Sequence, residues 1–176
     1  MIDFSRNYFE LFGLPQRFQA DSASLENAYR RLQTEVHPDR FASAGEQEKR
    51  VALQSSARVN EAYRALKDPV SRAQYLLSLH GIDALSETDT QLPMDFLERQ
   101  LERREAAAQA VSTNDSSALA AILADVRREA NDLVSELAHA IDEQQSFTDA
   151  RMPVRELKFL AKLADDLNAM QSSLDD

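Results

Sequence analysis

The feature that most constrains the fold is a long apolar seam in the second half of the chain. Between residues 116 and 144, apolar side chains recur at alternating spacings of four and three residues. This spacing keeps one face of an α-helix apolar and is typical of helices that pack side by side. The seam consists of Leu119, Leu123, Val126, Ala130, Leu133, Leu137 and Ala140. We therefore expect residues 116–144 to form one long helix of a bundle.

Two further amphipathic segments flank this seam. Residues 93–112 form the first and end at the polar stretch STNDSS, and the second begins near Pro153 and runs to about residue 174. The residues of the last segment that we expect to face inward are Leu160, Leu163, Leu167, Met170 and Leu174. Three such helices with short connections predict an antiparallel three-helix bundle.

The first eighty residues predict four helices. A short one covers about residues 8–13, and a long one covers 22–36, with Asp21 or Ser22 as its cap and Pro38 just after its end. Another long helix runs from about residue 45 to 67, and a fourth begins at Pro69 and ends at Gly81. The expected inward faces of the two long helices are Leu25, Ala28, Tyr29, Leu32 and Val36, and Val51, Ser55, Val59, Ala62 and Leu66.

The composition supports an all-α fold, because glycine (3) and proline (5) are scarce and good helix formers dominate the 176 residues. The polar stretch GIDALSETDTQLP separates the two groups of helices. We therefore expect an N-terminal domain over 1–80, a linker over 81–92 and the three-helix bundle over 93–176.

Charge and cysteine content exclude several classes of protein. Residues 1–80 carry 11 Lys and Arg against 10 Asp and Glu, whereas residues 81–176 carry 9 against 20. An acidic half beside a near-neutral one argues against nucleic-acid binding. The absence of cysteine excludes disulfides and thiolate metal sites. No apolar run is long enough for a membrane span, and no secretory signal begins the chain, so we expect a cytoplasmic protein without membrane contact.

Signals for catalysis or for metal binding are weak. The histidines are His37, His80 and His139, and none has a metal-ligand partner one helical turn away. His80 suits the end of a helix, where a cation interacts well with the dipole, and His139 suits a solvent-facing flank. We expect no catalytic residue, no metal and no cofactor, and a small helical enzyme is the least favoured alternative.

The sequence His37-Pro38-Asp39 lies between the two long helices of the first half. On its own it is compatible with an ordinary helix stop, with histidine at the C-terminus, proline as the breaker and aspartate in a turn. Its surroundings are more specific. The segments NYFELFGLP, AYRRLQTEVHPDR and VNEAYRALKDPVSRAQYL occur in that order around it. Together they resemble the J-domain, which stimulates the ATPase of DnaK-type heat-shock chaperones, over about residues 6–80.

The remainder of the chain extends this resemblance. The segments RAQYLLSLHG, FLERQLERRE and VRELKFLAKL, with an acidic helical C-terminal half, are similar to the HscB family of J-type co-chaperones of bacterial iron–sulfur cluster assembly. That resemblance implies two protein partners, an HscA-type chaperone ATPase and an IscU-type iron–sulfur scaffold protein. It also implies that the bundle is the client-binding domain.

The resemblance assigns residues to each partner. His37, Pro38 and Asp39, with Tyr29, Arg30, Arg31 and Arg40, would bind the chaperone. An aspartate there can accept charge-assisted hydrogen bonds from a partner arginine, and the arginines can steer the encounter. A solvated helix face is the alternative interpretation of the arginines.

Leu97, Leu101, Glu102, Glu105 and Phe159 would bind the scaffold protein. By helical geometry, Leu101 lies at the border of an apolar face, and Phe159 lies roughly 70° from the centre of the leucine face of its helix. By the same geometry, one face of the segment 93–112 gathers Phe96, Leu97, Arg104, Ala107, Ala108 and Val111. Bundle core remains the alternative for the two leucines, and a solvated face for the glutamates.

Glu98 departs from the family pattern, which can place an apolar residue after Leu97, so scaffold recognition could differ. Two functional alternatives also stay open. One is a J-domain protein with another client, and the other is a regulatory helical interaction module that does not stimulate a chaperone.

Overall fold

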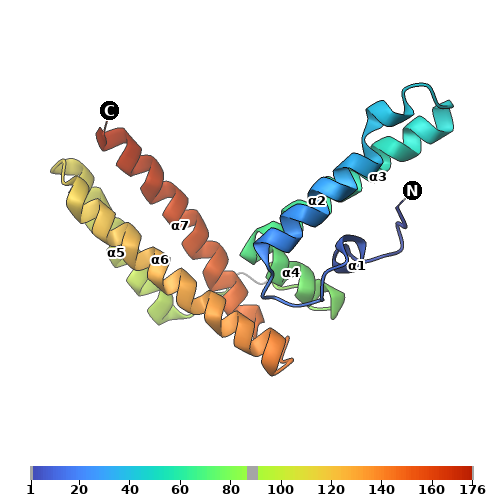
Figure 1. Cartoon of the computed structure of the whole chain (residues 1–176). Helices are drawn as coiled ribbons and strands as arrows, with labels where there is room; N and C mark the ends of the chain where they lie inside the picture. The colour runs from blue at the N-terminus through green and yellow to red at the C-terminus, as the bar shows by residue number, and fades with distance from the viewer. Residues whose placement is uncertain (1, 87–90, 176) are drawn as a thin grey trace. The chain divides into compact units, whose positions relative to one another are not determined.

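The computed structural model describes residues 2–86 and 91–175, and all regular structure among them is helical (Figure 1), which confirms the all-α fold. Within these ranges no helix combines the length and the apolar character that crossing a membrane requires. The helices are α1 (Tyr8–Phe12), α2 (Ser22–Val36), the 3-10 helix η1 (Pro38–Phe41), α3 (Glu46–Lys67), α4 (Pro69–Leu79), α5 (Met94–Ser112), α6 (Ser116–Ala138), the π-helical turn η2 (His139–Glu143) and α7 (Arg151–Asp175).

The chain divides into two compact units, Met1–Leu76 and Leu77–Asp176, and the division falls within α4. Part of the linker that we expected over residues 81–92, namely residues 87–90, lies outside the described residues.

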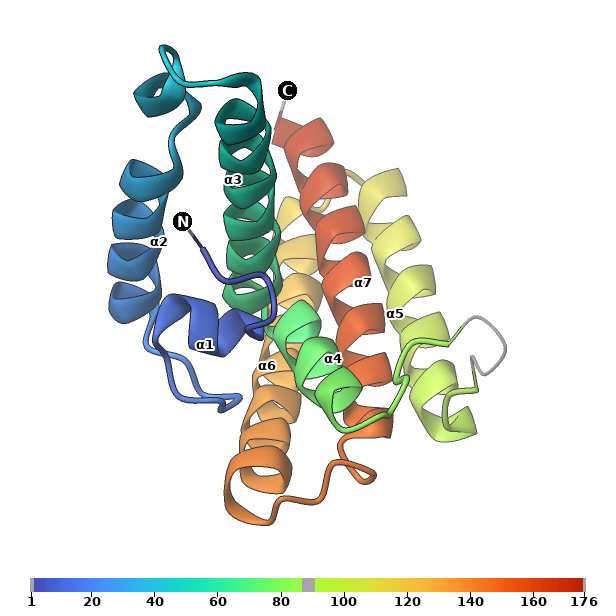
Figure 2. The same cartoon turned by 90° about the vertical axis from the view of Figure 1, so that its right-hand side faces the viewer.

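The first unit is built on the antiparallel pair α2 and α3, which lie side by side in Figure 2. Helix α2 has the predicted bounds, because its local signals are strong at both ends. The Asp21 carboxylate accepts hydrogen bonds from the backbone N–H groups of Ala23 and Ser24. Pro38 keeps His37 in an extended conformation, with φ −59° and ψ 127°, so the helix ends at Val36.

The inward face of α3 differs from the prediction at one position. Ala52 is buried, whereas Val51 is only half-buried. The face therefore follows spacings of three and four residues from Ala52 to Ser55 and Val59. Helix α1 completes this core with Phe9 and Phe12, and the Asn7–Glu10 capping box fixes its start.

The second unit is a bundle of α5, α6 and α7, in which α6 packs against both neighbours. Its central seam is as predicted, except that Ala130 is only half-buried. The prediction was wrong for Met170 of α7, whose exposed fraction is 38%. The last turns of α7 lie beside the start of α6, where Gln171 donates a hydrogen bond to the Ser116 hydroxyl. The bundle ends there, so no further turn of α6 covers Met170.

Candidate functional site

The sequence His37-Pro38-Asp39 is exposed at the junction of α2 and η1. The side chains of His37 and Asp39 are 52% and 90% exposed, and Pro38 is half-buried. The segment between α2 and α3 is partly regular, because Pro38 opens the 3-10 helix η1. We call residues 37–39 the tip. The exposed side chains of His37 and Asp39 are open to a partner, and Pro38 also ends α2, as the helix-stop interpretation predicts.

The tip has an internal hydrogen bond. The backbone N–H of Asp39 donates to Nδ1 of His37 at 3.3 Å, and Nδ1 also lies 3.6 Å from the Asp39 carboxylate. An Nδ1 that accepts a hydrogen bond carries no proton, so the neutral ring in this geometry carries its proton on Nε2. The local structure therefore fixes the ring while the Asp39 carboxylate remains open to solvent.

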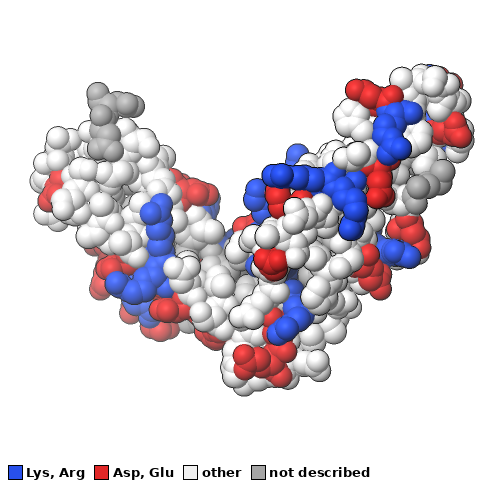
Figure 3. Space-filling view, in the orientation of Figure 1, with Lys and Arg blue, Asp and Glu red and all other residues white. Residues whose placement is uncertain are grey.

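The predicted basic residues of α2 are exposed about two helical turns before the tip. Figure 3 shows basic side chains gathered over α2. The Arg30 side chain is 74% exposed and pairs with Glu26 at 3.4 Å, and Arg31 is exposed as well. Arg40 differs, because its Nη1 donates to the backbone carbonyl of Thr34 at 3.0 Å. Two arginines are thus presented to solvent, and a third is held against the last turn of α2.

Tyr29 lies between α2 and α3, whereas Arg30 and Arg31 point to solvent. Its ring stacks on Tyr63 of α3 with centroids 4.0 Å apart, and its hydroxyl donates to Asn60 at 2.9 Å. The Tyr63 hydroxyl donates to Glu26 at 2.6 Å, and this hydrogen bond, helped by Arg30, lowers the pKa of the Glu26 carboxyl. Tyr29 therefore joins α2 to α3 at the position next to Arg30 in the sequence.

The two leucines assigned to α5 are on the surface and not in the bundle core. Leu97 is 37% exposed and Leu101 is 59% exposed. The face that we expected on α5 is only partly buried, because Leu97, Arg104 and Ala108 are exposed. The buried residues of α5 are Phe96, Gln100, Ala107 and Ala110. The buried face of α5 is centred near Phe96. Because successive residues of a helix are rotated by 100°, Leu97 lies at the edge of this face.

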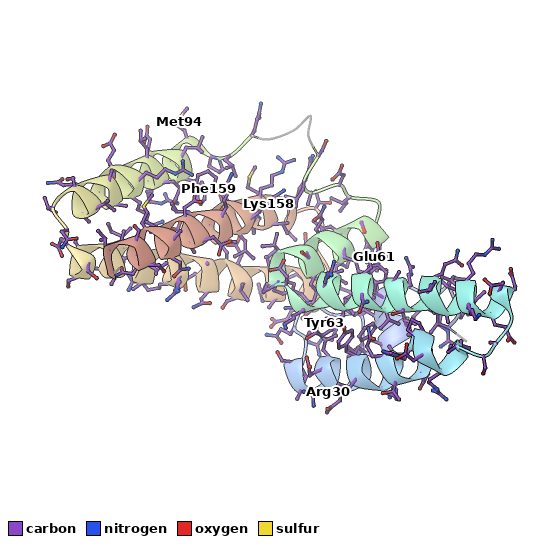
Figure 4. All side chains as sticks on the ribbon, turned by 90° about the horizontal axis from the view of Figure 1, so that it is seen from above. Arg30, Glu61, Tyr63, Met94, Lys158 and Phe159 are labelled. Atoms are coloured by element: carbon purple, nitrogen blue, oxygen red, sulfur yellow. The ribbon has the colours of Figure 1, made fainter. Side chains whose placement is uncertain are left out.

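Phe159 is half-buried between α5 and α7, as Figure 4 shows. Its ring meets the buried ring of Phe96 edge to face, with centroids 5.6 Å apart. The guanidinium of Arg104 lies over the same ring, 5.5 Å from its centroid. The contact with Phe96 therefore holds the Phe159 ring in place, and part of the ring remains at the surface. This exposed part faces the side of α5 that carries Leu97 and Arg104.

Acidic side chains border these apolar residues. Glu102 and Glu105 are exposed on α5, and so is Glu98. We call Leu97, Leu101, Glu102, Glu105 and Phe159 the apolar–acidic surface.

One exposed residue of this face was missed by the sequence reasoning. Met94, at the start of α5, is 70% exposed and precedes Leu97 and Leu101 by three and seven residues. That helical spacing was the signal that could have found it.

The arrangement suits protein binding at both places. An exposed carboxylate beside arginines can form charge-assisted contacts, and an aromatic anchor among leucines is a typical centre of a protein interface. Among the described residues, no group of three or more His, Asp and Glu side chains is placed to hold a metal ion. His139 is exposed, as expected of a flank residue, but its Nδ1 lies 2.7 Å from the carboxylate of Glu143, a potential ligand one helical turn away that the sequence analysis did not count. The His80 ring stacks on Phe147.

Family models match both halves of the chain. Residues 7–75 match the DnaJ domain, and residues 92–168 match the HSCB C-terminal oligomerisation domain. The chain is 41% identical over 175 residues to a co-chaperone protein HscB homolog of Burkholderia vietnamiensis, and the match covers 99% of both chains.

Solved structures agree with these matches. Chaperone HscB from Vibrio cholerae is 37% identical with a TM-score of 0.86, and the match covers 96% of this chain and 99% of that one. Human co-chaperone protein HscB is 30% identical with a TM-score of 0.88, covering 96% of this chain and 83% of that one. The chain therefore belongs to the HscB family of co-chaperones, with a J-domain followed by the C-terminal helical domain of that family.

Proposed function

We propose that this protein stimulates the ATPase of an HscA-type chaperone through the tip and delivers an IscU-type iron–sulfur scaffold protein through the apolar–acidic surface. In this proposal residues 1–80 act on the chaperone and residues 93–176 hold the scaffold. Residues 81–92 connect these two domains. The observation that carries the proposal is that one chain exposes both the Asp39 carboxylate and an aromatic-centred apolar group on α5 and α7.

The chaperone step is a matter of differential binding. Arg30 and Arg31 approach an acidic patch of the chaperone and orient the encounter. Asp39 then accepts hydrogen bonds from a chaperone arginine, and His37 is already fixed for contact by the bond from Asp39 N–H. If these contacts are stronger in the hydrolysis-competent state of the chaperone, binding shifts its population toward that state.

The scaffold step uses an anchored aromatic ring. Phe159 is held by Phe96 and Arg104, so little side-chain freedom is lost when a partner covers it. Leu97 and Leu101 supply apolar area around it, and Glu102 and Glu105 supply charge at the rim. Holding the scaffold on the same chain as the tip raises the local concentration of scaffold at the chaperone.

Hydrolysis belongs to the chaperone in this proposal. The protein itself is not an enzyme, uses no cofactor or metal of its own, and works in the cytoplasm. A small helical enzyme would instead turn over a small molecule without any partner.

A steady-state ATPase assay tests the proposal. The HscA-type chaperone is measured alone, with this protein, with the IscU-type scaffold, and with both. We expect stimulation by this protein alone and, with both added, a rate above the sum of the separate effects. Stimulation without scaffold binding would indicate another client, and scaffold binding without stimulation would indicate an interaction module.

A further inference from the structure

A cavity of about 260 Å³ is lined in part by Phe159, and we call it the Phe159 pocket. Its apolar lining comes from Leu85, Leu92 and Phe159, and Lys158 and Lys162 of α7 line it as well. Figure 4 shows Lys158 and Phe159 close together on α7. The pocket therefore combines an apolar interior with two cations.

The walls of the pocket are held in place by a buried arginine. Arg155 is 7% exposed, and its Nε donates to the carbonyl of Ala84 at 2.7 Å. Its Nη1 lies 3.4 Å from the carbonyl of Gln91. These bonds fix the backbone next to Leu85 and Leu92 onto α7, so these two walls of the pocket are set by the fold.

The two lysines differ from three of the arginines in this acidic half. Arg99, Arg103 and Arg128 all pair with carboxylates. Lys158 and Lys162 are exposed one helical turn apart, and neither pairs with a carboxylate among the residues that the structure describes. Residues 81–176 carry 9 basic against 20 acidic side chains, so two unpaired lysines beside an apolar pocket form a local positive site.

The size and chemistry of the pocket select its occupant. Pockets for small molecules measure about 300–1,000 Å³, and this one is smaller. It has room for one apolar side chain, and its lysines attract a carboxylate next to that side chain. Phe159 belongs both to this pocket and to the apolar–acidic surface, so one bound segment would contact the two without a gap.

We propose that the Phe159 pocket binds an apolar side chain of the scaffold protein that has an acidic residue beside it. This inference rests on the proposed function, because the occupant belongs to the same client. It adds two lysines to a surface whose assigned charged residues, Glu102 and Glu105, are acidic.

Scaffold affinity, measured by calorimetry at low and physiological salt, tests the inference. We expect the Lys158→Glu/Lys162→Glu variant to bind the scaffold about tenfold more weakly at low salt and to lose part of the salt dependence of the wild type. Lys158→Arg/Lys162→Arg keeps the charge and should bind normally. Arg128→Glu is the control, because it reverses an exposed charge on α6 outside the pocket.

A second variant separates this inference from the proposed function. If Leu101→Ala weakens scaffold binding while the double lysine reversal leaves it unchanged, the pocket inference is overturned and the proposed function stands. If the wild-type protein fails to bind the scaffold, both fall. If the reversal changes only the sedimentation of the protein, a second copy occupies the pocket, and the inference is again overturned.

Discussion

Arg40 donates a hydrogen bond from Nη1 to the backbone carbonyl of Thr34, at 3.0 Å, and so connects η1 to the last turn of α2. Thr34 belongs to the final turn, whose carbonyls lack intrahelical partners. Arg40 directly follows the tip, and Thr34 belongs to the helix that precedes the tip, so this bond spans the tip. Arg40 therefore helps to hold the tip, in addition to any contact that it makes with a chaperone.

We predict that Arg40→Ala lowers the free energy of unfolding by about 1 kcal/mol and also reduces ATPase stimulation. Arg30→Ala is the matched variant. It loses only a surface ion pair, so its stability should stay within about 0.5 kcal/mol while stimulation falls. Tyrosine fluorescence during urea unfolding reports this unit, because all four tyrosines lie in the first 76 residues. Equal stability of Arg40→Ala and Arg30→Ala would contradict the holding role.

The Tyr63–Glu26 hydrogen bond predicts a pH-dependent contribution to stability. The pKa of Glu26 is lowered in the folded state, so its stabilisation is complete above the ordinary value of 4.5 and is lost as pH falls through the lower, folded value. We predict that Tyr63→Phe destabilises the protein at neutral pH and that the difference shrinks at about pH 3.

Urea midpoints of wild type, Tyr63→Phe, Glu26→Gln and the double variant, at both pH values, check this prediction. The two substitutions should be non-additive at neutral pH, because each removes the same bond. A difference between wild type and Tyr63→Phe that is the same at both pH values would show that the carboxylate is not responsible.

Phe159 and Leu160 are neighbours in sequence with different surroundings, because Phe159 is half-buried and Leu160 is fully buried. We predict that Phe159→Ala weakens scaffold binding at least tenfold and costs no more than about 2 kcal/mol of stability. Leu160→Ala should cost about 2–5 kcal/mol. Calorimetric binding and thermal unfolding by circular dichroism measure the two effects. Unchanged scaffold affinity in Phe159→Ala would assign this ring to the core alone.

Met94 extends the apolar row of Leu97 and Leu101 by one turn. We predict that Met94→Ala weakens scaffold binding about fivefold without changing stability, since 70% of the residue is exposed. Leu53→Ala, at an equally apolar and 58% exposed position on α3, is the control and should bind scaffold normally. Equal effects of the two substitutions would show a general response to lost apolar surface.

The elements that the sequence predicted well are those with local signals. Asp21 and Pro38 set the bounds of α2 because a cap and a proline act on their immediate neighbours. The seam of α6 was predictable because a regular spacing points one face at its neighbours for the whole length of the helix. The 3-10 helix at the tip follows from no such signal, because Pro38 suits a helix start and a turn equally.

The sequence could not predict which residues of a helix its neighbouring helices cover. Met170 continues the spacing of Leu163 and Leu167, yet it lies where the bundle ends and is exposed. Leu97 lies beside Phe96 in sequence, yet only Phe96 is covered by α7. The Phe159 pocket joins Leu85 and Leu92 to residues of α7 more than sixty positions later, and no local pattern relates them.

His37→Gln is the substitution that tests the account most directly. It removes the imidazole from an exposed position, so the fold should remain intact, as circular dichroism and scaffold affinity would show. Steady-state ATPase of the HscA-type chaperone should then lose its stimulation by this protein almost completely. Full stimulation by a folded His37→Gln variant would contradict the claim that the tip acts on the chaperone.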